Sequence, residues 1–539
     1  MSLSLSPGVL GVGVLLLGLA LFSAYCAGRW ILAQAGVLRR DGSLIVLGAA
    51  GVGLLVLGSR LWIAEGRVSW APYLDQLFAE FTGLLLPLSH GTLRAGDLFA
   101  ANNEHRVVLT RTVSLALVWV DGEWDNRAEV LVTFLLESAT VAWICALCWT
   151  FLGWVRGTYV GAAALLPMLV ACDWENLVSG FQSQFGFLVL GSVVAVSLIS
   201  GPAPGRMAAW GVLSLSALLV GSMVSGLLTA AAVAAAVLVM AYSRRTGWRP
   251  CAAFCAALLA IAAAGWLTRA IIPPQPGMRA DGVGSFVAAF LAYASWPLWP
   301  GIRGFLCLWL PWTALAGRIM LRRETPRLAP FALALGLWVL LQAAALAWGR
   351  ASLSGLVGSR YTEVLGLGFV ANAAAVVLME AGRGASRAGR GAYWVLALVW
   401  FAGVGGSEVW RSQAVYRPYF LQFRRQTLEH EERLGTFMRT GDARVITDVD
   451  FPRIPGSAAE ILSLLGDGRI QRLLPAPLRR ELVREREPAR LGQMQSGPVS
   501  FAAIRLLNRG VWLVAAGAAL LAGALVTALR RERTGPSPP

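Results

Sequence analysis

The chain has 539 residues, of which 57% are hydrophobic and only 14% are charged, and its mean hydropathy is +0.62. Soluble globular chains carry roughly 25% charged residues, and the apolar residues here form long unbroken stretches, so a soluble domain and a disordered chain are both excluded. The net charge of +16 would point to nucleic acid in a soluble protein, but the arginines gather in short loops between apolar stretches, so we expect no nucleic-acid partner.

Thirteen apolar segments follow one another along the chain, and a helix needs about 20 apolar residues to cross a bilayer. In order, they are 8–27, 43–63, 128–152, 158–172, 185–200, 206–222, 226–242, 250–268, 303–321, 328–348, 361–380, 391–407 and 506–529. The shorter apolar segment 286–300 contains Pro297 and Pro300, so we expect it to be re-entrant or interfacial. The sequence thus predicts an all-α polytopic membrane protein, a bundle of about 13 transmembrane helices surrounded by membrane lipids.

Five arginine clusters indicate how this bundle is oriented. They contain Arg39 and Arg40; Arg244, Arg245 and Arg249; Arg322, Arg323 and Arg327; Arg383, Arg387 and Arg390; and Arg530, Arg531 and Arg533. With thirteen spans, all five clusters lie on one side of the membrane, and the positive-inside rule makes that side cytoplasmic. Abundant arginine, alanine and glycine suggest a GC-rich bacterial genome, so we expect an inner-membrane protein whose N-terminus and long loops are periplasmic.

The chain divides into three parts on this interpretation. Residues 1–407 form the transmembrane bundle, which carries the long periplasmic loop 64–127 with loop helices of its own. Residues 408–505 form a polar periplasmic domain, in which helical stretches alternate with proline-rich turns. Residues 506–539 form the final transmembrane helix and a cytoplasmic tail.

The first outer loop concentrates side chains that could carry chemistry. Asp75 lies shortly after the second span, and a run of Asn103, Glu104, His105 and Arg106 follows later in the same loop. Such a run is dense in groups that bind ions, phosphates or sugars. The alternative is a solvated loop with an interfacial aromatic belt.

The second outer turn separates two apolar helices and contains Asp173, Glu175, Asn176 and Gln182. Ionisable groups between apolar helices usually face the interior of the bundle or a water-filled cavity. Asp173 and Glu175 are two residues apart and do not share a helix face, but in a turn both could approach a cation or a sugar. They are therefore the candidate metal ligands.

The fourth outer loop contains Arg350, Arg360 and Tyr361. The planar guanidinium of arginine suits phosphate, and two arginines on the outer side run against the charge bias of the chain. The alternative is an interfacial Arg/Tyr anchor.

Several of these strings resemble the GT-C glycosyltransferases, integral membrane enzymes that use polyprenyl-phosphate-linked sugars. They also look like a bacterial group of uncharacterised proteins usually placed near that superfamily. The likeness covers roughly residues 60–370 and rests on Tyr73-Leu74-Asp75-Gln76, Asn103-Glu104-His105-Arg106, Trp174-Glu175-Asn176, Gly180-Phe181-Gln182 and Ser359-Arg360-Tyr361. The resemblance implies a GT-C-like bundle, with Asp75 as catalytic base or orienting group. It further implies that Asp173 and Glu175 could bind a divalent metal, Mg²⁺ or Mn²⁺, and that Arg360 could hold the lipid phosphate.

The chemistry of a sugar phosphate fits the same residues. The donor already carries a good leaving group, so the enzyme needs a base for the acceptor and a positive charge beside the departing phosphate. The candidate catalytic residues are Asp75, Glu104 and His105, and His105 is the alternative base because its ordinary pKa suits that role. The candidate substrate-binding residues are Asn103, Arg106, Asn176, Gln182, Arg350, Arg360 and Tyr361.

We therefore expect a membrane glycosyltransferase, acting by hexosyl or pentosyl transfer. It would move a sugar from a polyprenyl-phosphate donor to a lipid or glycan acceptor of the cell envelope on the periplasmic face. One alternative is a transporter or flippase for a lipid-linked glycan, which needs charged groups along a path through the bilayer, where the sequence offers few. The other is a non-catalytic subunit of envelope assembly.

Overall fold

The computed structural model describes residues 6–36, 42–73, 75–200, 205–244, 248–271, 277–380, 386–447, 458–484 and 494–534. The structure is 82% helical, and no β-strand occurs among these residues. Long apolar stretches favour helices in a membrane because a helix pairs every backbone N–H and C=O within its own segment. The prediction of an all-α polytopic membrane protein is confirmed at this level.

The helices of the first half of the chain begin with two long apolar ones and continue through short loop helices. They are α1 (Pro7–Gly36), α2 (Gly42–Ala64), the π-helix η1 (Leu77–Leu85), α3 (Leu86–Ser89), α4 (Ala95–Leu98), α5 (Val108–Asp121), α6 (Asn126–Leu152), α7 (Trp154–Met168), α8 (Trp174–Val178), η2 (Gly180–Gln182), α9 (Ser183–Leu198), α10 (Arg206–Val220), η3 (Val224–Gly226), α11 (Leu227–Arg244) and α12 (Trp248–Leu267).

The helices of the second half run from a short apolar helix to the C-terminal one. They are α13 (Val283–Ala294), α14 (Ile302–Arg322), α15 (Ala329–Gly349), η4 (Ala351–Leu353), α16 (Ser359–Glu380), α17 (Arg387–Arg411), the π-helix η5 (Ser412–Tyr416), α18 (Arg417–Thr440), α19 (Arg444–Thr447), α20 (Ala458–Gly466), η6 (Ile470–Leu473), α21 (Ala476–Arg484), α22 (Pro498–Leu507) and α23 (Gly510–Thr534).

Eleven helical segments in the described part of the chain are long and apolar enough to cross a membrane. The expected spans 158–172 and 206–222 correspond to α7 and α10, which have only 15 residues each. Thirteen crossings are therefore not confirmed, although α7 returns antiparallel along α6, with Gly157 against Cys148 and Gly161 against Cys145. Within the expected re-entrant segment 286–300, the structure has the end of the 12-residue helix α13.

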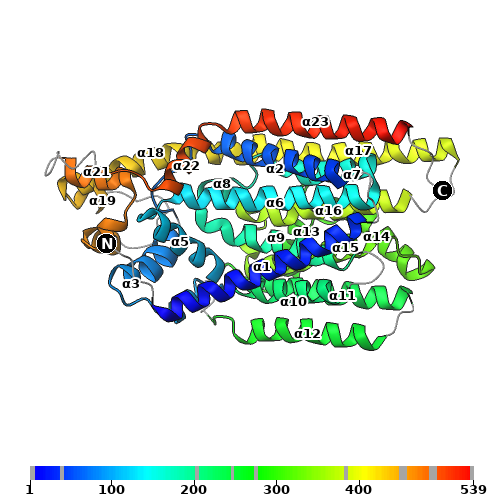
Figure 1. Ribbon diagram of the computed structural model, residues 1–539, viewed down its shortest axis with the longest axis horizontal. Coiled ribbons are helices and arrows are strands. Elements are labelled where there is room, and N and C mark those ends of the chain that lie inside the picture. The colour runs from blue at the N-terminus through cyan, green and yellow to red at the C-terminus, as the bar shows by residue number, and fades with distance from the viewer. Residues whose placement is uncertain are drawn as a thin grey trace.

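The long helices lie side by side along the longest axis of the molecule (Figure 1). α1 begins at one end of the bundle and α23 finishes at the other, so the two ends of the described chain lie on opposite sides. The short helices α3, α5, α19, α21 and α22 gather at the end where α1 begins, and we call this the outer end.

The outer end has its own hydrophobic core, which joins the two parts of the chain that the sequence treats as separate. Phe81 and Trp124 from the first loop pack in one cluster with Leu434, Ile461 and Leu478 from the region after residue 408. The two parts are also tied by polar contacts, since the backbone N–H of Trp124 donates to the carbonyl of Leu473 at 2.7 Å. Loop 64–127 and region 408–505 therefore form one structural unit.

The expected domain boundary at 407/408 falls inside a helix. α17 continues through the π-helical turn η5 into α18, so residues 388–440 are one helical run of 53 residues. The apolar half of this run lies in the bundle, and the polar half extends to the outer end (Figure 1). A change from apolar to polar composition marks where a helix leaves the membrane. In this chain the helix continues past that point.

Small residues allow α2 and α23 to approach closely. A Cβ added to Gly58 would lie 2.5 Å from the backbone nitrogen of Val514, and one added to Gly517 would lie 2.4 Å from that of Leu55. Both helices place their glycines seven residues apart, Gly51 with Gly58 and Gly510 with Gly517. Such small-residue faces are a common means of packing membrane helices, and this one fixes α2, which carries a residue of the buried site described below.

The orientation of the bundle can be tested by labelling. We expect a cysteine at Thr440, the exposed end of α18, to react with a membrane-impermeant maleimide in intact cells, whereas a cysteine at the exposed Glu324, after α14, should react only after permeabilisation. The parent chain with its seven native cysteines sets the background. Equal labelling of both positions in intact cells would contradict an orientation in which the arginine clusters are cytoplasmic.

Candidate functional site

A tight turn presents the first group of candidate residues. The N–H of Asn102 donates to the carbonyl of His105 at 2.9 Å, and the N–H of His105 donates to the carbonyl of Asn102 at 3.1 Å. Asn103 has a φ of 51°, a left-handed conformation that asparagine adopts more readily than most residues. Asn103 is exposed, and its role is to form the turn through this conformation. Glu104 and His105 line a cavity.

That cavity has a volume of about 100 Å³ and lies between the first loop and the outer ends of α9, α15 and α16. Its polar lining consists of Glu104, His105, Ser225, Gln342, Arg350 and Tyr361. The Arg350 guanidinium donates to Glu104 Oε1 at 2.6 Å, and the same oxygen lies 3.9 Å from His105 Nε2. Two of the candidate outer loops therefore meet through one ion pair.

The second outer turn meets α16 in the same region. Ser359 Oγ donates to Glu175 Oε2 at 2.6 Å, and the N–H of Arg360 donates to the same oxygen at 3.3 Å. The Arg360 side chain is 28% exposed, and its Nε lies 3.9 Å from Glu175 Oε2. Arg360 Nε is buried without a hydrogen-bond partner among the described residues. This nitrogen therefore retains a donor that no described residue accepts.

Asp75 lies within the electrostatic field of both groups. Burial raises the pKa of its carboxyl above the ordinary value, Arg360 and Arg350 oppose that shift, and Glu175 and Glu104 reinforce it. The sequence separation between these residues is large, so only the fold brings their charges together. A half-buried carboxylate of raised pKa beside two guanidinium groups is a suitable arrangement for a general base.

His105 is held in a form that limits its use as a base. The N–H of Val224 donates to its Nδ1 at 3.4 Å, so the proton of a neutral ring is on Nε2, toward Glu104. Burial lowers the pKa of His105 to about 4, Glu104 opposes the shift, and Arg350 and Arg360 add to it. The ring is therefore neutral near pH 7 with its lone pair engaged, which favours Asp75 over His105 as the base. The pKa of Glu104 is lowered because His105 and Arg350 outweigh the effect of burial.

Other candidate residues lie elsewhere. Arg106 points away from the cavity, since it donates to the carbonyl of Thr268 at 2.6 and 2.9 Å and to that of Phe99 at 2.6 Å. Gln182 is fully buried and does not line the cavity described above. Asn176 is also fully buried, and its amide donates to Glu363 at 3.1 Å and to the carbonyl of Arg360 at 3.4 Å.

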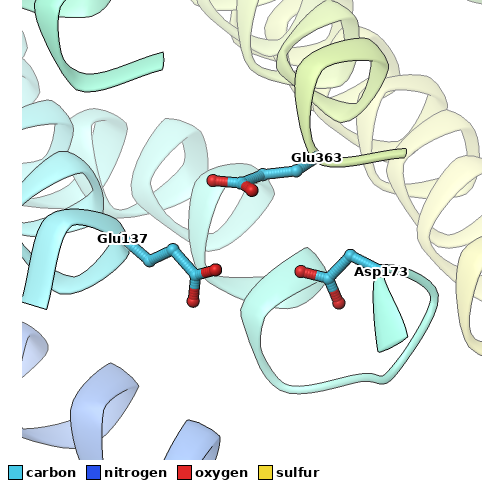
Figure 2. A group of neighbouring side chains, drawn as sticks. All are labelled: Glu137, Asp173 and Glu363. Atoms are coloured by element: carbon cyan, nitrogen blue, oxygen red, sulfur yellow. The ribbon is translucent and has the colours of Figure 1, made fainter. Parts of the chain in front are cut away.

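Asp173 and Glu175 do not share one set of neighbours. Asp173 pairs with Arg60, which donates to Asp173 Oδ1 at 3.0 Å and also to Oδ2, and to Glu137 Oε2 at 2.7 Å. Figure 2 shows the carboxylates of Glu137, Asp173 and Glu363 facing a common space, and one oxygen from each lies within 4.8 Å of the others. The structure thus places Asp173 with Glu137 and Glu363, whereas Glu175 faces Ser359 and Arg360.

We define the buried acidic cluster as Arg60, Glu137, Asp173, Glu363 and Glu408. Of these residues, sequence analysis identified only Asp173. All five side chains are at most 4% exposed. The signal was present, because a charged residue inside an apolar segment is rare and usually has a partner. Arg60, Glu137, Glu363 and Glu408 each belong to a helix that sequence analysis treated as a span or its edge.

Comparison with known proteins gave no match to any family model, to any curated protein or to any solved structure.

Proposed function

We propose that this protein is a membrane glycosyltransferase of GT-C type. It transfers a hexosyl or pentosyl unit from a polyprenyl-phosphate donor to an envelope acceptor, a lipid or a glycan, at the outer end of the bundle. In a bacterial inner membrane that end is periplasmic. The observation that supports the proposal most directly is that Arg360 and Arg350 both act electrostatically on Asp75. Arg350 and its ion-pair partner Glu104 also line one cavity.

The proposed reaction uses each of these groups once. Asp75 accepts the proton of the acceptor hydroxyl as its oxygen forms a bond to the anomeric carbon of the donor. The bond between that carbon and the phosphate oxygen breaks, and the electron pair leaves with the phosphate. Arg360, whose Nε has no hydrogen-bond acceptor among the described residues, stabilises the negative charge on the leaving group. Glu104 keeps Arg350 at the cavity wall through their 2.6 Å ion pair.

Binding of the donor tests this assignment without knowledge of the sugar. We expect Arg360→Lys in purified full-length protein to weaken binding of a fluorescent polyprenyl monophosphate by about 10–100-fold, because lysine keeps the charge but loses the planar two-pronged contact, worth about 1.5–3 kcal/mol. Arg106→Lys is the matched control, since Arg106 donates to backbone carbonyls away from the cavity, and it should change binding less than about twofold. Equal binding by wild type and Arg360→Lys would contradict the proposed phosphate contact.

The buried acidic cluster supports a second candidate function, a transporter or flippase for a lipid-linked glycan. Four carboxylates and an arginine among the helices supply buried charge in the bundle that a cation-coupled transporter would need. The two functions differ in their products. A transferase breaks the bond between sugar and phosphate, whereas a transporter delivers the lipid-linked donor intact to the other leaflet. Analysis of the products formed from a labelled polyprenyl-phosphate sugar in reconstituted vesicles separates them.

A further inference from the structure

The buried acidic cluster gathers oxygen atoms from four separate parts of the chain. Glu137 comes from α6, Asp173 from the turn before α8, Glu363 from α16 and Glu408 from α17. One carboxylate oxygen of Glu137, Asp173 and Glu363 lies within 4.8 Å of those of the other two, and Figure 2 shows the three groups facing one space. Carboxylates that repel one another are held together here by the packing of helices.

The positive charge within the cluster does not balance its negative charge. Arg60 pairs with Glu137 at 2.7 Å and with Asp173, and Glu363 and Glu408 also lie within its electrostatic field. Within the described part of the chain, the Arg60 guanidinium is thus the one cationic group that pairs with this cluster, and the four carboxylates are all at least 96% buried. Buried charges without compensation are costly, so the cluster requires further positive charge in the form of protons or a cation.

Unpartnered atoms indicate where that charge would bind. Glu137 Oε1, Glu363 Oε1 and Glu408 Oε2 are all buried and have no hydrogen-bond partner among the described residues. The second oxygen of Glu137 is occupied by Arg60, and the second oxygen of Glu363 by Asn176 at 3.1 Å. The partnered oxygens fix the orientation of Glu137 and Glu363, so the free oxygens of these two carboxylates are held in position for a ligand. Both oxygens of Asp173 accept hydrogen bonds from Arg60.

We propose that Glu137 and Glu363 bind a hard divalent cation of the Mg²⁺, Mn²⁺ or Ca²⁺ class through their free oxygens, with Asp173 shared between Arg60 and the cation as the third ligand. Such ions prefer carboxylate oxygens, and this set connects α6, the turn before α8 and α16. The site shares Asp173 with the expected Asp173–Glu175 pair but takes its other two ligands from Glu137 and Glu363 in place of Glu175. It also does not depend on the proposed transferase activity, because none of its three ligands touches the outer cavity.

Mn²⁺ binding measured on the purified full-length chain tests the proposal, with electron paramagnetic resonance as the readout. We expect one Mn²⁺ per chain, displaced by Mg²⁺ or Ca²⁺, and a higher melting temperature on binding, because a ligand of the folded state stabilises it. Glu363→Gln should weaken Mn²⁺ affinity by at least about 100-fold, since even the loss of outer partners of a metal costs about 10–100-fold. Glu80→Gln is the matched control, a fully buried carboxylate outside the cluster, and should leave Mn²⁺ binding unchanged.

Three outcomes would overturn the proposal. They are no stoichiometric Mn²⁺ binding by the wild type, unchanged binding in both Glu137→Gln and Glu363→Gln, and a stability that varies with pH but not with divalent cations, which would mean that protons occupy the cluster. The wild-type measurement remains decisive even where a variant fails to fold. Failure of the proposed function would instead appear in the Arg360→Lys donor-binding experiment, which does not involve the cation.

Discussion

Replacing Arg60 with methionine is expected to lower the free energy of unfolding by about 3–5 kcal/mol, the usual cost of breaking a buried ion pair by removing one partner. Arg60 is fully buried and donates to Glu137, to Asp173 and to the carbonyl of Val170 at 3.4 Å. Methionine fills part of the space but leaves both carboxylates without their cation. Thermal or denaturant unfolding in detergent, followed by loss of helical signal, measures the change.

Arg433→Met is the matched control for this prediction. Arg433 also pairs with a glutamate, Glu429, at 2.6 Å, but the Glu429 side chain is 54% exposed and stays hydrated without its partner, so the change should cost less than about 1 kcal/mol. The double variant Arg60→Met with Asp173→Asn should recover part of the stability, because it removes one of the carboxylates left unpaired. An Arg60→Met protein as stable as Arg433→Met would mean that the cluster is compensated by other means.

Much of the fold could be predicted from the sequence, because the membrane imposes strong rules on apolar segments. Long apolar stretches without internal polar residues must be helices there, and the helical bundle follows directly. The continuity of α17 and α18 could not be predicted in the same way. Composition changes near residue 408, but the backbone conformation does not, since helical hydrogen bonds form in water as well as in lipid.

The outer site was partly predictable because its residues come from loops that carry unusual side chains. Glu104 pairs there with Arg350, and Glu175 lies beside Arg360, but these partners could be identified only from contacts between distant segments. The Arg106 guanidinium could bind phosphate, but it points away from the cavity and donates to the carbonyl of Thr268. Which way a loop side chain points depends on turn geometry, and a sequence pattern of residue types does not record it.

The buried acidic cluster could not be assembled from sequence because its members lie on four helices and a turn. Each is a single charged residue among apolar ones, and only helix packing shows that they share a space. Asn176 connects this cluster with the outer site, since its amide donates to Glu363 and to the carbonyl of Arg360. Changes in the cluster should therefore displace Arg360 as well as lower stability.

Under the proposed transferase mechanism, replacing Asp75 with asparagine is expected to reduce sugar transfer by about 10²–10⁴-fold, the usual contribution of a general base. Asparagine keeps the shape of the side chain but cannot accept the acceptor's proton. The variant should fold at least as well as the wild type at pH 7, because burial raises the pKa of Asp75 in the folded protein and ionisation therefore opposes folding. Transfer from a polyprenyl-phosphate sugar in reconstituted membranes measures the loss.

The pH profile adds a signature that a merely structural role would not produce. Under the proposed mechanism Asp75 must be ionised to act, so wild-type activity should fall as pH decreases through its pKa, which lies above the ordinary aspartate value of about 3.9. In Asp75→Asn the remaining activity should lack this acidic limb. Asp467→Asn, a change at a surface carboxylate that pairs with His90, is the control and should retain both rate and profile. Full activity in Asp75→Asn would exclude Asp75 as the base and leave His105, released from Val224 by movement of the loop, as the group to examine.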